Sequence, residues 1–86
     1  MPITKQIVAD RLSAYLRHEI TLDQLVDWAE REIMDGEFDD RDLPTLRDIV
    51  ARLGVADVRT FGLTWEDCET MLRRLGYEAR VEVTAV

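Results

Sequence analysis

The sequence predicts a mainly α-helical fold: a compact bundle of four short helices followed by a C-terminal β-strand. Apolar residues recur at helical spacing in four stretches, and the last stretch of the chain changes to a spacing of two. The chain has 86 residues, which suits a single small globular domain over residues 1–86. Hydrophobic residues make up 47% of it, a composition typical of a chain that folds.

The first expected helix covers residues 5–17, with Thr4 as its N-cap. Its apolar face carries Val8, Leu12 and Tyr15. His18, the only histidine of the sequence, follows this helix. Its neighbour Glu19 would not face it on a helix, so we interpret His18 as an exposed residue near a helix end rather than as a catalytic acid or base.

The second expected helix begins after Thr21, because Thr21 and Gln24 have the spacing of a capping box. We predict that Gly36 ends this helix in the left-handed conformation. The expected buried stripe consists of Leu22, Leu25, Val26, Ala29 and Ile33.

The third expected helix covers residues 43–53, with Asp40 or Asp42 as its cap and a proline in its first turn. The fourth covers residues 65–75 and has Thr64 as its N-cap. Cys68 lies on the apolar face of this fourth helix, so we interpret it as a buried and unreactive thiol.

The C-terminal part offers two alternatives for strand pairing. Residues 77–84 alternate between apolar and polar side chains, which predicts a strand with one apolar face. A strand needs a partner for its backbone groups. Residues 55–61 form either a loop with a helical turn or a short strand. As a strand, residues 56–61 would pair with the C-terminal strand in a small two-stranded sheet. Otherwise it would pair with a second copy of the chain and form a homodimer.

Negative charge is concentrated in one segment. The formal net charge is −7, yet residues 19–42 alone hold ten acidic residues against Arg31 and Arg41. The chain before this segment is slightly basic, and the chain after it is nearly neutral. The excess acid therefore belongs to the second expected helix and to the loop that follows it.

Part of this charge forms a stripe on the second expected helix. Asp23, Asp27 and Glu30 are spaced i, i+4 and i+7, which places them on one flank of a helix. A solvated helix face tolerates such a stripe, and a surface that attracts a basic partner is the functional interpretation. Trp28 lies on the other flank, where it either covers the edge of the core or is an exposed interface anchor.

The loop after this helix holds Glu37, Asp39 and Asp40. The register of an EF-hand would make Arg31 the first calcium ligand, so we expect no metal here. A solvated turn or a contact with a basic partner remains. We include these three acids, with Asp23, Asp27, Glu30 and Trp28, in the predicted partner-binding surface.

Several classes of function are not expected from this sequence. No apolar run is long enough to span a membrane, the N-terminus lacks a secretory signal, and Cys68 is the only cysteine. The acidic balance argues against binding to nucleic acids or anionic membranes. The four glycines form no phosphate cradle, and we expect neither a cofactor nor enzymatic activity. Because no secretory signal is present, we expect a cytoplasmic location.

Residues 15–30 read YLRHEITLDQLVDWAE. They contain the end of one expected helix, an Ile-Thr turn, and the start of an acidic helix that carries a tryptophan. This run resembles the opening helical hairpin of small acidic bacterial immunity proteins of the colicin type. Those proteins bind a basic toxin through acidic surface residues. The resemblance implies that Asp23, Asp27 and Glu30 would contact such a partner. The chain from Gly54 onward does not follow that pattern.

Two functional hypotheses follow. The first is a protein-binding module whose acidic segment engages a basic protein, as an immunity protein or antitoxin does. The second is a structural or regulatory homo-oligomer without catalytic activity, in which the acids only maintain solubility.

Overall fold

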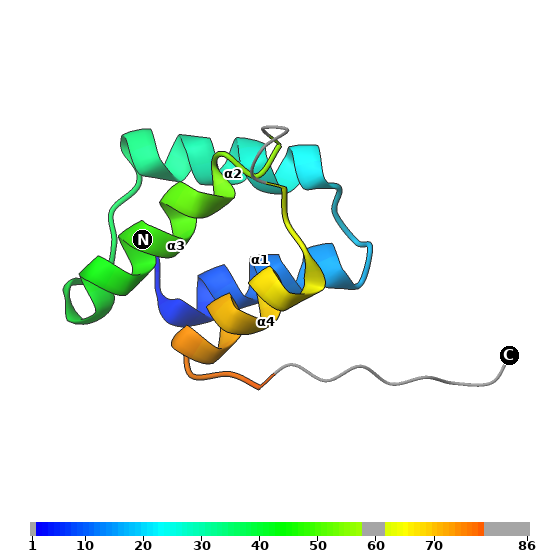
Figure 1. The fold of residues 1–86 in the computed structure, drawn as a ribbon. Coiled ribbons are helices and arrows are strands. Elements are labelled where there is room, and N and C mark those ends of the chain that lie inside the picture. Colours follow the sequence, from blue (N-terminus) through cyan, green and yellow to red (C-terminus); the bar gives the residue numbers. More distant parts are fainter. Residues whose placement is uncertain (1, 58–61, 79–86) are drawn as a thin grey trace, which may run out of the picture.

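The computed structural model of the chain describes residues 2–57 and 62–78 (Figure 1). In this part the chain forms a mainly helical fold, which confirms the predicted fold class, and each helix boundary predicted for it is met within one residue. The helices are α1 (Lys5–Leu16), α2 (Leu22–Asp35), the short 3₁₀ helix η1 (Asp40–Asp42), α3 (Leu43–Leu53) and α4 (Trp65–Arg74).

α1 is the central helix of the bundle, because it contacts α2, α3 and α4 (Figure 1). The largest interface joins α2 to α3, and α4 packs on α1. The apolar faces of all four helices meet in one core. Its largest fully buried side chains are those of Val8, Leu12, Leu25, Val26, Leu46, Ile49, Val50, Leu53, Cys68 and Leu75. Burial of each large aliphatic side chain contributes about 1.5–3 kcal/mol to stability.

Local capping sets where the helices begin. The Thr21 hydroxyl accepts a hydrogen bond from the Gln24 amide at 3.1 Å, and the Gln24 side chain accepts one from the Thr21 amide at 2.8 Å. Thr64 and Asp67 form the same reciprocal pair at the start of α4, with distances of 3.1 and 3.0 Å. Both capping residues satisfy amides that a helix start would leave unpaired, so these helix starts are determined by four residues each.

The end of α2 differs from the prediction. Gly36 is extended, with φ −77° and ψ 156°, and does not adopt the predicted left-handed conformation. The chain leaves α2 in this direction because the next residues pair with the N-terminal segment. The Ile3 amide donates to the Glu37 carbonyl at 2.6 Å, and the Asp39 amide donates to the Ile3 carbonyl at 2.9 Å. Gly36 is still required, since a Cβ atom there would collide with the carbonyl oxygen of Glu32.

His18, not a glycine, takes the left-handed conformation at the end of α1, with φ 62°. The Glu19 amide reaches back to the Ala14 carbonyl at 2.8 Å, which closes the helix end. The His18 side chain is exposed, which confirms its interpretation as a residue near a helix end.

The burial of Ile33 contradicts its prediction, and the burial of Trp28 decides between its two predicted roles. Ile33 was expected in the buried stripe of α2, but its side chain is 43% exposed, so that prediction is wrong. Trp28 is only 7% exposed. It therefore covers the edge of the core, and its alternative interpretation as an exposed anchor is wrong.

The described residues contain no β-strand, and their only strand-like pairing is an isolated parallel bridge between Ile3 and Phe38. Tyr77 and Glu78 belong to no strand, and the rest of the predicted strand lies outside the described residues. Ala56 and Asp57 form a turn after α3, and residues 58–61 also lie outside the described part. The fold therefore does not support the C-terminal strand, and the homodimer through it stays a prediction.

None of the helices in the described part combines the length and the apolar character that crossing a membrane requires.

Candidate functional site

The acidic stripe of α2, formed by Asp23, Asp27 and Glu30, is fully on the surface. All three side chains are exposed, and the helical rise spreads their Cα atoms over about 10 Å. Within residues 2–57 and 62–78, none of the three carboxylates forms a hydrogen bond or an ion pair. The structure thus brings together these three of the predicted site residues as a row of uncompensated charges.

Trp28 lies on the flank of α2 that faces α1. The guanidinium carbon of Arg11, on α1, is 5.4 Å from the centroid of the Trp28 ring, which is a cation–π distance. This contact and the core cover most of the indole surface. Trp28 therefore holds α2 against α1 and is separate from the acidic stripe.

An apolar patch adjoins the C-terminal end of the stripe. Ile33 is 43% exposed, Met34 79% and Val55 38%. A shallow groove of about 350 Å³ runs between the end of α2 and the end of α3. The groove is lined by Glu30, Ile33, Met34, Ala51, Gly54 and Val55.

The position of α3 explains this groove. A Cβ atom on Gly54 would lie 3.7 Å from the Cγ atom of Glu30, so the end of α3 reaches α2 one turn before α2 ends. The last turn of α2, with Ile33 and Met34, extends beyond this contact and stays uncovered. The missing side chain of Gly54 adds to the hollow.

Sequence reasoning missed Met34, although a signal was present. Met34 follows Glu30 by four residues and Asp27 by seven, so it lies on the same stripe as the acids. A large apolar residue in line with three carboxylates indicates a surface that combines charge with an apolar contact. Ile33 was noticed but assigned to the core.

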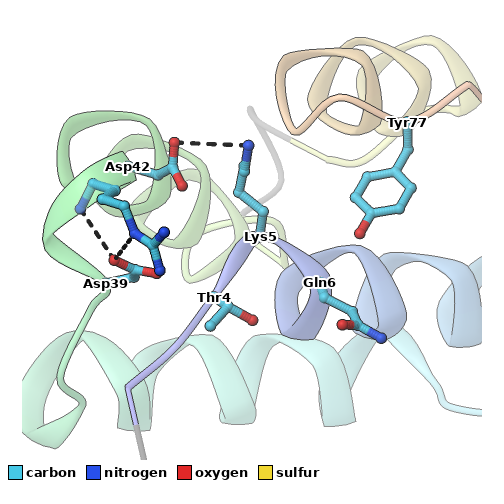
Figure 2. A pocket seen from close by; sticks show the side chains of 7 residues that line it. Thr4, Lys5, Gln6, Asp39, Asp42 and Tyr77 are labelled. Carbon is cyan, nitrogen blue, oxygen red and sulfur yellow. Dashed lines mark hydrogen bonds and ion pairs between the residues drawn. The ribbon is translucent and has the colours of Figure 1, made fainter.

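The acids of the loop between α2 and α3 are arranged differently (Figure 2). The Asp39 carboxylate accepts a hydrogen bond from the Arg41 amide at 3.1 Å and lies 3.6 Å from Arg41 Nε. Asp42 lies 3.8 Å from the Nζ atom of Lys5 at the start of α1. These two acids therefore cap η1 and connect it to α1, and their charge is balanced by neighbours.

The same loop forms one wall of a polar cleft of about 480 Å³ (Figure 2). The cleft is lined by Thr4, Lys5, Gln6, Asp39, Arg41, Asp42 and Tyr77. Its charges of both signs lie side by side, so it offers no net field to a charged ligand. Glu37 and Asp40, the other two acids predicted to bind a partner, are exposed beside this loop.

A third acid with a structural role is Asp67 at the start of α4. A hydrogen bond from the Thr64 amide lowers the pKa of the Asp67 carboxyl. Partial desolvation opposes this shift, and the Thr64 hydroxyl and the charge of Arg52 add to it. Arg52 lies 3.5 Å from Asp67 and donates to the Gly62 carbonyl at 2.9 Å. This group connects α3 to the start of α4.

Cys68 is buried on the inner face of α4. Burial, together with the nearby charge of Asp67, raises the pKa of its thiol to about 11. The thiolate form, which is the nucleophile, is therefore rare at neutral pH. The predicted burial of Cys68 is confirmed.

Among the described residues, no group of three or more histidine, cysteine, aspartate or glutamate side chains is placed to hold a metal ion. Comparison of the chain with protein-family models, with curated proteins and with solved structures found no match in any of the three.

Proposed function

We propose that this chain is a small protein-binding module whose acidic stripe on α2, formed by Asp23, Asp27 and Glu30, engages a basic protein. The observation that carries the proposal is that these carboxylates are exposed, aligned and without an ion pair inside the described residues. The ion pairs of that part join other residues.

The energetics support this assignment. Acidic side chains at spacings of three and four residues on one helix repel each other by a few tenths of a kcal/mol per pair. The helix dipole stabilises acids in the first turn of a helix. Asp27 and Glu30 lie beyond the first turn of α2, so they do not gain this stabilisation. The stripe therefore contributes little to folding, whereas the field of its charges steers a basic surface towards α2.

The proposed role is the neutralisation of a basic partner, as immunity proteins and antitoxins do. The resemblance of residues 15–30 to the opening hairpin of colicin-type immunity proteins supports it, because the three stripe residues fall in that hairpin. The net charge of −7 further favours association with a basic protein.

The test is an affinity capture from the source cell over a salt series. We expect the wild-type chain to retain a basic protein at low salt and to lose it as screening increases, since the Debye length falls from about 10 Å at 0.1 M salt to about 3 Å at 1 M. The double variant Asp23→Lys with Asp27→Lys should not retain it.

The matched control is Asp10→Lys with Glu66→Lys, which changes the net charge by the same amount at exposed positions of α1 and α4 that lie outside the predicted partner-binding surface. We expect this control to retain most of the binding. Equal loss in both variants would show a response to net charge alone, and unchanged capture by the α2 variant would refute the proposal.

A further inference from the structure

We propose that the groove between the ends of α2 and α3 receives an apolar side chain of the same basic partner, so that the partner segment is amphipathic. This inference rests on the proposed function and adds the chemistry of the contact. The groove begins at Glu30, the last acid of the stripe, and continues over Ile33, Met34 and Val55. Charge and apolar surface thus form one continuous face.

Three of the four large apolar side chains that are exposed in the described part gather at this patch. Met34 is 79% exposed, although its thioether side chain adapts well to apolar contacts. Ile33, in the last turn of α2, and Val55, just after the end of α3, expose their side chains next to Met34. Apolar side chains that gather on a surface beside a polar rim are typical of a protein interface.

The charges around the groove select the occupant. Among the described residues, Glu30 is the one ionisable residue that lines the groove. Asp27 lies about one turn earlier on the same stripe. A second copy of this chain on the same face would bring these acids against each other, at a net charge of −7 per chain. A segment with Lys or Arg beside its apolar side chain instead satisfies both the groove and its rim.

The register of α2 defines how such a segment is arranged. Asp23, Asp27, Glu30 and Met34 follow one line, and the distance along the helix from Glu30 to Met34 is about 6 Å. A helical partner would carry its apolar residue at one end of a face and basic residues one and two turns away from it. This mode is the docking of an amphipathic helix in a groove, with an apolar anchor and charged neighbours.

The test uses two synthetic helical peptides of equal positive charge. One carries leucines at the end of a lysine stripe, and the other has glutamine in place of those leucines. Each peptide is titrated into the isotope-labelled full chain, and affinity is read from amide and methionine methyl shifts. We expect the leucine peptide to bind about tenfold more tightly, and its shifts to centre on Ile33, Met34 and Val55.

The variant Met34→Gln should remove the advantage of the leucine peptide and leave the binding of the glutamine peptide unchanged. Met34 is exposed, so this variant should fold; Val55→Thr, which keeps shape and β-branching, is a second variant of the same groove. Equal affinity of both peptides for the wild-type chain would overturn the groove proposal and leave the proposed function standing.

Two further outcomes are distinguishable. If neither peptide distinguishes the wild-type chain from the Asp23→Lys, Asp27→Lys variant, the proposed function fails together with this inference. If sedimentation shows a dimer that Met34→Gln dissociates, a second copy occupies the groove and the inference is overturned. A loss of stability in the free Met34→Gln chain would mean that the groove is already covered by the chain itself, which also overturns it.

Discussion

The two acid-rich regions of this chain both carry an excess of negative charge, yet their acids have different roles. In the loop between α2 and α3, Asp39 caps η1 and Asp42 lies beside Lys5 of α1. On α2, Asp23 and Asp27 form no hydrogen bond or ion pair through their carboxylates among the described residues. The number of acids in a segment therefore does not show which of them are available to a partner. Their surroundings in the fold decide that.

The loop acids and the stripe acids should affect the free energy of unfolding in opposite directions. A loop acid that accepts an amide hydrogen bond stabilises the fold, so its removal costs stability. Glu30 has another acid, Asp27, as its one charged neighbour at a spacing of three or four residues on α2. It therefore opposes folding slightly, and its neutralisation should increase stability. Residues whose removal stabilises a fold are the ones to associate with binding. Four measurements test or refine this comparison.

The largest effect is expected for Trp28, which the sequence left open as core or surface. Trp28→Ala should lower the free energy of unfolding by about 3–5 kcal/mol, because it removes a buried indole and the contact with Arg11. Met34→Ala, at an exposed position on the same helix, should change it by less than about 0.5 kcal/mol. Urea unfolding measures both. Comparable values for the two variants would show that Trp28 is not part of the core.

A smaller loss is expected in the loop. Asp39→Ala removes the side-chain acceptor of the Arg41 amide and the ion pair with the same residue, and should cost about 1 kcal/mol. Asp40→Ala is the matched control, because the Asp40 side chain is exposed and forms no hydrogen bond or ion pair within the described residues. Its effect on urea unfolding should be within a few tenths of a kcal/mol. Equal effects would remove the distinction between capping and free acids.

The opposite sign is expected on α2. Glu30→Gln should raise the free energy of unfolding by a few tenths of a kcal/mol at low salt, since it relieves the repulsion by Asp27 three residues earlier at nearly constant helix propensity. The gain should disappear at about 1 M salt, where the charges are screened. A loss of stability at low salt would mean that the stripe stabilises the fold and would contradict the comparison.

The smallest effect is expected at Asp67, whose pKa is lowered in the folded chain mainly by the hydrogen bond from the Thr64 amide. An acid with a lowered pKa contributes stability above its unfolded pKa, near 3.8, and loses it as the pH falls through the folded value. Asp67→Asn should therefore be less stable than the wild type at pH 6, and the difference should shrink below pH 4. Thermal unfolding from pH 2 to 6 measures it. A difference that does not change with pH would assign the effect to packing.

The helices and their starts were predictable because the signals are local. The pairs Thr21 with Gln24 and Thr64 with Asp67 lie within one helical turn, so no distant residue is needed to form them. The apolar periods likewise predicted most of the core, including Cys68. The acidic stripe also follows from helix geometry alone, since positions i, i+4 and i+7 share a flank of any α-helix.

The same local rules failed where a distant residue intervened. Gly36 has the position of a left-handed helix end, yet pairing of the following residues with Ile3 holds it in an extended conformation. Ile33 has the period of a buried residue, yet α3 meets α2 near Glu30 and leaves the last turn uncovered. Neither contact has a signature within the segment it alters.

The sequence by itself determined the four helices of the described part, their caps and the row of acids on α2, because each depends on spacings within a few turns. Only the tertiary structure decided which charges are balanced and which apolar residues remain exposed. Lys5 approaches Asp42 from another helix, Arg11 covers Trp28, and the crossing of α3 over α2 opens the groove beside Met34. Electrostatic compensation and burial depend on neighbours in space, and these neighbours are far apart in the chain.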